Sequence, residues 1–530
     1  MRRISNPTVL CGCLVLALGC AGNTNVGPGS GGSNGTSGTT GSAGTTGVGG
    51  GAAGDQGSGG SSSTAGTTGG GGNVGTGTGG SAGTTGAGGR GGAVGGGGRG
   101  GNTSTAGTTG TAGTTGTGGS TQCTITATTT MSTKIPTVAI VTFTSSLSSM
   151  TSASIDFGLT TSYGMTAPVD LTQANYRTLL LGMKAAKMYH YRVNATSSAG
   201  TCQSQDYTIT TGALLAGLMK PTVTPTTATG LYGGFLITGQ YQGNPTTAYI
   251  LDADGDYVWW FSIGGDVTGA RMDYAGTHMW INSANVPSGT TRVHRVSMDG
   301  MTDEDLSSQF TGLNHQLTVL PDETVAFYAY NNTAGCDDIK ERAPNGTVKT
   351  IVNSGTALGV SGGCHCNNVQ YSAGDNTLVF SDLDHVMVAK VSRTDGSTVW
   401  TLNDTASSKN LTGATWAGGE HGLHLIDMTH ILIFNNNSTA GMTSKAIEVQ
   451  LDPANKKAMQ TWSYDGMIAN MIMGDVQRLP NGNTIVAYST KGALHEVSSN
   501  MTKLQTWTWA AGQTIGYIEK RASLYGPPPK

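Results

Sequence analysis

Three histidines recur along the chain at similar intervals, and their imidazole side chains can bind ligands or take part in catalysis. They are His315, His365 and His421, which are 50 and 56 residues apart. If the chain repeats one structural unit at this step, their imidazoles converge from neighbouring units. Convergent imidazoles can ligate a divalent metal, or they can donate charge-assisted hydrogen bonds to an anion such as sulfate or phosphate. A neutral histidine can also act as a nucleophile and form a covalent intermediate.

The surrounding residues favour an anion site over a metal site. A histidine metal site usually includes a carboxylate, or ligands closely spaced on one strand. In an extended segment His421 and His424 point to opposite faces, so they do not form a chelating pair. The run from Cys364 to Cys366 contains a histidine between two cysteines but has no second ligand pair at zinc-finger spacing. We therefore expect an oxyanion site and no cofactor.

A recurring turn predicts the scaffold that holds these histidines. Asp-Gly or Asn-Gly turns, or weaker versions of them, recur 45 to 59 residues apart and precede apolar, strand-like runs; they lie at 252–255, 298–300, 344–346, 393–396, 452–455 and 499–500. This period, with alternating apolar strands and short hairpins, is typical of β-propeller blades. Six turns predict a six-bladed β-propeller over residues 226–530.

A second set of turns lies between the first and marks the inner hairpin of each blade. The residue that opens an inner hairpin should lie near the central channel. His315, His365 and His421 all fall at such openings, and Arg271 lies at the comparable place in the second blade. We therefore expect the three histidines to hold one repeat position and to meet in the channel.

Residues 121–212 have a different pattern. Short runs rich in Thr, Val, Ile and Tyr alternate with Ser/Gly turns, which predicts a two-sheet β-sandwich that looks like a fibronectin type III domain. Cys123 and Cys202 bracket this segment, so we expect a disulfide between them. Cys336 is expected to pair with Cys364 or Cys366, which leaves one odd thiol.

The N-terminal 120 residues predict export rather than a folded domain. Residues 1–20 combine two arginines with a short apolar run, as in a secretory signal, and Leu16–Cys20 resembles a bacterial lipobox in which Cys20 is acylated. A plain cleaved signal is the alternative. Residues 21–120 are almost only Gly, Thr, Ser and Ala, and form a disordered tether. We expect an exported bacterial protein, either periplasmic or a lipoprotein of the outer membrane or cell surface.

The overall charge argues against one class of partner. The formal net charge is −3 and only 11% of the residues are charged. No basic stripe with interleaved aromatic residues appears, so the sequence predicts no nucleic-acid binding.

The C-terminal domain resembles the bacterial aryl-sulfate sulfotransferases, which are six-bladed propellers that move sulfate between phenols without a nucleotide sulfate donor. The resemblance runs from about Gly230 to Tyr525, and a sandwich before the propeller is also similar to the family. It is carried by the segments 314–322, His365 with 367–371, 420–421 leading to Phe434-Asn-Asn, 474–483 and 520–525.

The resemblance implies a ping-pong transfer between a small-molecule aryl sulfate and a phenol. It places the nucleophile at His421, with His315 and His365 as oxyanion ligands. The family arginine falls at Ser381-Asp-Leu383, where this chain has no arginine. The residues left to supply substrate contacts are Arg271, Asn435, Lys445 and Lys491.

Two other functions are compatible with the sequence. The missing arginine suits a non-catalytic, surface-displayed propeller that binds a ligand or glycan, since a fold does not fix a function. The three histidines could also serve a metal-dependent lyase or hydrolase.

Overall fold

The computed structural model describes residues 123–528, apart from 228, 243–244, 286–289, 404–406 and 438–440. Its regular structure is almost entirely β-strand, arranged in eight sheets, which confirms the all-β prediction. Within these residues no helix has the length and hydrophobicity needed to cross a membrane. The expected signal sequence, Cys20 and the tether of residues 21–120 lie outside the described residues.

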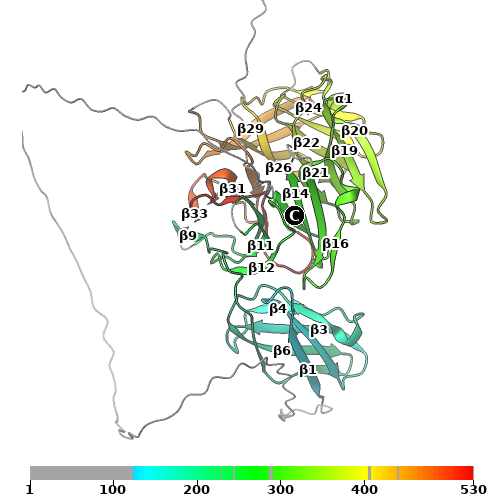
Figure 1. The fold of residues 1–530 in the computed structure, drawn as a ribbon, viewed down its shortest axis with the longest axis vertical. Coiled ribbons are helices and arrows are strands. Elements are labelled where there is room, and N and C mark those ends of the chain that lie inside the picture. The colour runs from blue at the N-terminus through cyan, green and yellow to red at the C-terminus, as the bar shows by residue number, and fades with distance from the viewer. Residues whose placement is uncertain are drawn as a thin grey trace, which may run out of the picture. The chain divides into compact units, whose positions relative to one another are not determined.

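The first two sheets form a β-sandwich, drawn in cyan in Figure 1. One sheet has the order β1-β2-β5, and the other has the order β4-β3-β6-β7 with β8 also paired to β6. Their bounds are β1 (Ile125–Met131), β2 (Ala139–Ser145), β3 (Met150–Gly158), β4 (Met165–Pro168), β5 (Thr178–Leu180), β6 (Met188–Ser197), β7 (Gly200–Gln203) and β8 (Tyr207–Thr210). Side chains from both sheets share one core. The sandwich prediction is confirmed, and the likeness to fibronectin type III stays a prediction.

Alternation along the strands explains how the sandwich core forms. In β6 every second residue is buried, as expected for a strand with one face against a core. The expected disulfide joins Cys123 to Cys202.

The other six sheets are the six predicted blades of the propeller. Blade one contains β10 (Phe235–Gln242), β11 (Ala248–Leu251), β12 (Tyr257–Phe261), β34 (Thr514–Ile515) and β35 (Glu519–Arg521). Blade two contains β13 (Gly269–Met272), β14 (His278–Asn285), β15 (Thr290–Ser297) and β16 (Asp303–Asp305). Blade three contains β17 (Leu313–Val319), β18 (Val325–Asn331), β19 (Cys336–Arg342) and β20 (Val348–Asn353).

The last three blades complete the ring. Blade four contains β21 (Cys366–Ser372), β22 (Thr377–Asp382), β23 (Met387–Ser392), β24 (Thr398–Leu402) and β25 (Asn410–Leu411). Blade five contains β26 (Glu420–Asp427), β27 (His430–Asn435), β28 (Lys445–Asp452) and β29 (Lys457–Asp465). Blade six contains β30 (Asp475–Arg478), β31 (Thr484–Tyr488), β32 (Ala493–Val497), β33 (Lys503–Thr508) and β9 (Thr222–Pro225). The short helices are η1 (Ala174–Tyr176), η2 (Ser307–Gln309), α1 (Ser354–Leu358) and η3 (Ser489–Lys491).

Both ends of the propeller segment contribute to closing the ring. The early strand β9 pairs with β33 on the outer edge of blade six, so the propeller begins at Thr222, ahead of the expected start at residue 226. The late strands β34 and β35 pair with β10 in blade one. Sheets at the two ends of the segment are therefore completed by strands from the opposite end.

The predicted turns lie at the hairpins between outer strands. Gly255 and Gly346 have φ of 80° and 85°, which glycine adopts without steric cost. Each follows Asp or Asn, so the composition of these turns reflects the backbone that they must adopt.

Candidate functional site

The three recurring histidines meet in the structure. The ring centroids of His315 and His365 are 4.9 Å apart, those of His315 and His421 are 5.7 Å apart, and those of His365 and His421 are 6.3 Å apart. The Nε2 atoms of His315 and His365 are 3.4 Å apart. Blades three, four and five thus contribute one imidazole each to a single cluster.

Local irregularities in the inner strands aim two of these side chains. In β17 the pairing with β18 shifts between Asn314 and Leu317, and His315 within this bulge has φ of 55°. In β26 the register shifts between Glu420 and Leu423, on either side of His421. A bulge re-aims a side chain that regular alternation would place elsewhere, which is why bulges are frequent beside active sites.

His365 reaches the cluster by a different route. The bulge of β21 lies between Cys366 and Val369, so Asn367 occupies the place that corresponds to His421. His365 precedes this position by two residues and lies just before β21 begins. The expectation that all three histidines hold one repeat position is therefore wrong for His365, although its ring joins the other two.

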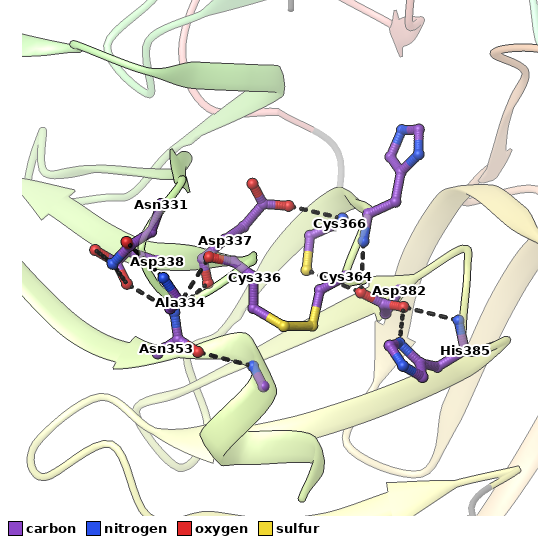
Figure 2. Close-up of a disulfide and its surroundings, with 12 residues drawn as sticks. Asn331, Ala334, Cys336, Asp337, Asp338, Asn353, Cys364, Cys366, Asp382 and His385 are labelled. Carbon is purple, nitrogen blue, oxygen red and sulfur yellow. Dashed lines mark hydrogen bonds and ion pairs between the residues drawn. A yellow bond between two sulfur atoms is a disulfide. The ribbon is translucent and has the colours of Figure 1, made fainter. Parts of the chain in front are cut away.

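Two carboxylates and a disulfide fix the backbone around His365 (Figure 2). Asp382 accepts a hydrogen bond from the His365 amide at 2.9 Å, and Asp337 accepts one from the Cys366 amide at 2.9 Å. The preceding residue, Cys364, forms a disulfide with Cys336. This pairing selects Cys364 from the two expected partners and leaves Cys366 as a buried free thiol.

Hydrogen bonding determines which nitrogen of His421 is available. The Nδ1 atom lies 2.7 Å from Oδ1 of Asn436. The amide nitrogen of Asn436 donates to the carbonyls of Asn470 at 2.7 Å and Met473 at 2.8 Å, so the amide oxygen must face the histidine. Because this oxygen only accepts, Nδ1 of His421 carries the proton and Nε2 has a free lone pair.

Burial keeps two of the imidazoles neutral. Burial lowers the pKa of His421 to about 3, against the raising effect of the Asn436 hydrogen bond. Burial, with contributions from His365 and His421, also lowers the pKa of His315 well below its ordinary value. Nδ1 of His315 faces Oδ1 of Asn314 at 2.5 Å, so its Nε2 also presents a lone pair toward His365.

Arg271 is already engaged within the propeller. Its guanidinium lies 3.5 Å from Asp475, donates to the carbonyl of Ile518 and contacts the side-chain oxygen of Gln316. Burial raises the pKa of Asp475 to about 6, against the lowering effect of Arg271. Above that pH the carboxylate is ionised and neutralises the arginine.

The other residues expected to contact substrate lie apart from the imidazole cluster. The Asn435 amide donates to the carbonyl of Ala417, so Asn436 rather than Asn435 contacts His421. Lys445 is 41% exposed and lies 3.8 Å from Asp465. Lys491 is exposed at the end of η3. None of the three has a contact with the histidines among the described residues.

Asn436, Asp382 and Asn367 were not among the predicted site residues. Asn367 is fully buried; its Nδ2 donates to the carbonyl of Glu420 at 2.6 Å, and its Oδ1 has no partner among the described residues. A signal for Asn436 was present, because the Asn cluster follows β27, the strand that pairs with β26, which carries His421. Strand register decides which member of the cluster faces the histidine, and the sequence alone does not show it.

The groups of potential metal ligands are used for other contacts. Cys364 lies near Asp382 and His385 but is bonded to Cys336, so the Cys364–Cys366 run does not present two thiolates. The carboxylates of Asp252, Asp254 and Asp256 surround the ammonium group of Lys184 at 2.7 to 3.2 Å.

A family comparison bears directly on this site. Residues 359–520 match the model of the arylsulfotransferase (ASST) family. This segment is similar to the arylsulfotransferase family. The matched arylsulfotransferase segment contains His365 and His421, whereas His315 lies ahead of it. The family supports arylsulfotransferase activity and a small-molecule aryl sulfate and phenol as the substrate class.

Comparisons with other sequences and with solved structures identify no close relative. No curated protein sequence matches the chain. A protein of unknown function from Bacteroides caccae is 13% identical over 54% of this chain and 98% of its own, with a TM-score of 0.37. The β-propeller domain of Cps50 (Swd1) from Myceliophteria thermophila is 9% identical over 54% of this chain and 86% of its own, with a TM-score of 0.36. These similarities are too low to indicate a shared function.

Proposed function

We propose that the arylsulfotransferase domain transfers a sulfuryl group from an aryl sulfate to a phenol through a sulfated His421. One observation carries this proposal: the Asn436 amide holds the proton of His421 on Nδ1 and leaves the Nε2 lone pair beside two further imidazoles. Burial keeps His421 neutral at pH 7, so the lone pair is available without prior loss of a proton.

The first half-reaction forms one bond and breaks one. Nε2 of His421 attacks sulfur, the bond between sulfur and the aryl oxygen breaks, and the aryl oxygen leaves with the bonding electrons as a phenolate. His365 and His315 surround the group being transferred. An N–H of His365 that is directed at a sulfuryl oxygen stabilises the charge that develops there.

The second half-reaction reverses the first with a new phenol. The acceptor oxygen attacks sulfur, and the N–S bond breaks with its electrons returning to Nε2 of His421. The phenol proton passes to Nε2 of His315, whose lone pair is free because its Nδ1 faces Asn314. His315 then releases the proton to solvent, since its pKa lies well below its ordinary value.

A turnover assay tests the proposal. Purified protein with p-nitrophenyl sulfate and phenol should release p-nitrophenol, and His421→Ala should abolish the release. The matched control is His430→Ala on the neighbouring strand β27, where the ring faces Asp427 and should not affect transfer. With donor alone, mass spectrometry should find one SO₃ group on the peptide that contains His421. Full activity of His421→Ala rules out the mechanism.

A binding function without turnover is the competing outcome. It gains support from the neutralised Arg271, because the ion pair with Asp475 leaves the cluster without an unpaired cation among the described residues. Saturable binding of aryl sulfates, with no product from any donor, would favour this function.

We also propose export and anchoring through Cys20. Two disulfides support an oxidising compartment, because such bonds persist mainly outside the cytosol. Cells fed a clickable fatty acid should label the intact protein and not Cys20→Ala; equal labelling of both would contradict the anchor.

A further inference from the structure

A cleft lies between the sandwich and the outer turns of blade one. It encloses about 480 Å³, a volume typical of small-molecule sites. The sandwich contributes the turn between β3 and β4 and the loop between β5 and β6, and the propeller contributes the start of β10 and the turn between β11 and β12. We call this site the interdomain cleft, and the side chains that define it are those of Leu159, Tyr163, Met165, Lys184, Phe235 and Asp254.

Packing between the two domains fixes the walls of the cleft. Ile135, Val138 and Leu181 of the sandwich are buried in one hydrophobic cluster with Val258 of blade one. The Thr137 hydroxyl also donates to the Val258 carbonyl at 2.7 Å. The two sides of the cleft are therefore held relative to each other, as in a preformed ligand site.

The cleft lies at the end of the blades opposite the imidazole cluster. His421 lies at the start of β26, so the inner strands begin at the imidazole end. In blade one, β11 runs in the same direction as the inner strands β34 and β35, because all three are antiparallel to β10. The turn after β11, which carries Asp254, therefore lies at the far end. A ligand in the cleft occupies a site separate from the one proposed for sulfuryl transfer.

Tyr163 forms a rigid part of the cleft. Its φ is 58°, a backbone conformation that is uncommon for residues other than glycine. Its hydroxyl donates to Asp206 at 3.0 Å, and the guanidinium carbon of Arg192 lies 4.6 Å from the ring centroid. Because the ring is already held in place, a ligand that contacts it costs little side-chain entropy.

The other apolar side chains come from both domains. At Gly182 a Cβ atom would lie 2.8 Å from Cζ of Phe235 and 3.7 Å from Sδ of Met165, so these two side chains approach each other over the Gly182 backbone. Leu159 is 49% exposed. Aromatic rings and a thioether make favourable contacts with an aromatic ring, which is therefore the apolar body that suits the cleft.

The charged edge of the cleft can accept hydrogen bonds from a ligand but has no ammonium N–H to offer. The Lys184 ammonium group lies 2.7 to 3.2 Å from the carboxylates of Asp252, Asp254 and Asp256, so each of its three N–H groups has a partner. Lys220 lies 2.7 Å from Asp256, so three carboxylates face two ammonium groups. Lys184 contacts Oδ2 of Asp254, whose side chain is 73% exposed, and Oδ1 can accept from a ligand.

This combination selects a ligand by its charge. The excess of negative charge repels anions, so an aryl sulfate does not suit the cleft. A neutral ligand gains the apolar contacts but not a charge-assisted hydrogen bond. An ammonium ion with an aromatic body gains both, because its N–H groups can donate to Asp254 while its ring contacts the apolar side chains.

We propose that the interdomain cleft binds small organic ammonium ions with an aromatic body. The Asp254 carboxylate receives the ammonium group, and the apolar side chains of the cleft contact the ring. This inference goes beyond the proposed sulfuryl transfer and does not depend on it.

Isothermal titration calorimetry of the full chain with three ligands tests the proposal. The ligands are 2-phenylethylammonium, neutral 2-phenylethanol and anionic phenylacetate, which share a phenyl ring. At low salt we expect the ammonium ion to bind about tenfold more tightly than the alcohol, and we expect phenylacetate not to bind.

Two variants separate the charge from the apolar contacts. Asp254→Asn should weaken ammonium binding about tenfold and leave alcohol binding unchanged, because it removes only the charge. Leu159→Ser should weaken the binding of both ligands about threefold, because it removes apolar contact area.

The chain offers a matched control for each variant. Asp395 is exposed and precedes Gly396 in the outer turn of blade four, as Asp254 precedes Gly255 in blade one. Val399 is 46% exposed on β24 of blade four. Asp395→Asn and Val399→Ser should keep the wild-type affinity, and so should His421→Ala, whose site lies at the other end of the blades.

Three results would overturn the inference. The first is an absence of ammonium binding to the wild type. The second is equal affinity for the ammonium ion and the alcohol, or wild-type affinity in Asp254→Asn, because the cleft would then recognise no charge. The third is that Asp395→Asn or His421→Ala weakens binding as much as Asp254→Asn, which would show that the ion binds elsewhere. No measurement uses turnover, so a failure of sulfuryl transfer leaves this test intact.

Discussion

At the residue scale, the Asn436 amide determines what His421 can do. A carboxylate in this place would attract a second proton to the imidazole and remove the lone pair at neutral pH, whereas a carbonyl oxygen fixes the tautomer without adding charge. The burial that lowers the pKa of His421 to about 3 has the same effect. Both features favour a neutral His421, as the proposed nucleophilic attack requires.

Replacing Asn436 should therefore impair the chemical step. In Asn436→Ala the His421 ring loses its fixed orientation and tautomer, and we expect kcat to fall about 100-fold, since misplaced or wrongly protonated imidazoles cause losses of at least this size. Steady-state kinetics measures the loss. Asn435→Ala is the control, because Asn435 bonds to the Ala417 carbonyl instead. Equal losses in the two variants would contradict the role of Asn436.

The Arg271–Asp475 pair makes a second residue-scale prediction. In Asp475→Asn the guanidinium keeps its charge and loses its counter-ion, while the amide oxygen can still accept from Ile518. The added net positive charge should lower KM for aryl sulfates severalfold at low salt, and less at high salt. The wild type should approach this behaviour below pH 6, where Asp475 takes up a proton. An unchanged KM at every pH would show that Arg271 does not influence the anion site.

At the element scale, the loop that ends at His365, just before β21, is held in place by contacts on both sides. We call this loop, with Cys364 and His365, the strap. The Cys336–Cys364 disulfide ties this loop to β19 of the neighbouring blade, and Asp382 on β22 accepts from the His365 amide. His365 needs this support because it lies outside the regular strand, where no ladder of hydrogen bonds fixes its backbone.

Removing this disulfide should change catalysis as well as stability. We expect Cys336→Ser/Cys364→Ser to raise KM for the aryl sulfate several-fold, because His365 would sample positions away from the sulfuryl oxygens. The control is Cys123→Ser/Cys202→Ser in the sandwich, which should lower the melting temperature and leave KM unchanged. KM is measured for both double variants at a temperature below both of their melting temperatures. If both pairs shift KM equally, or neither does, the strap does not position His365.

At the scale of the whole molecule, buried histidines make stability depend on pH. The pKa is lowered to about 3 for His421 and to about 4 for His424 and His495, mainly through burial. Below about pH 6.5 the unfolded chain binds protons at these residues that the folded chain does not. Asp337 and Asp475 act in the opposite direction, because their pKa values are raised to about 6 and the folded state binds protons there more readily.

His315 adds a fourth histidine with a lowered pKa and Glu420 a third carboxylate with a raised pKa, both through burial. The histidines still outnumber the carboxylates, so acidification should destabilise the fold. Between pH 7 and pH 5 each such histidine lowers the free energy of unfolding by roughly 2 kcal/mol, and each such carboxylate raises it by roughly 1 kcal/mol. The net effect is a decrease of a few kcal/mol. Urea unfolding at both pH values measures the difference. His495 lies outside the imidazole cluster. In His495→Gln the free energy of unfolding should fall less between pH 7 and pH 5 than it does in the wild type. A fold that is equally stable at pH 5 and pH 7 would contradict these protonation states.

The sequence by itself determined the features that depend on local chemistry. The Asp-Gly and Asn-Gly turns indicated the hairpins, since only a few residues tolerate the backbone that such turns require. Their period predicted six blades, and the recurrence of histidines indicated His315, His365 and His421 as one site. Cys123 and Cys202 could be paired because they bracket a single small domain.

Only the tertiary structure decided what depends on register and on distant partners. Bulges in β17, β21 and β26 set which residue turns inward, and a shift of one residue changes the face to which a side chain points. For this reason the sequence could not show that His365 enters from the loop, that Asn436 rather than Asn435 contacts His421, or that Cys336 joins Cys364. The state of Arg271 was equally hidden, because its counter-ion Asp475 belongs to blade six, which is remote in sequence and separated from blade two by blade one, so the two side chains meet only once the ring is closed.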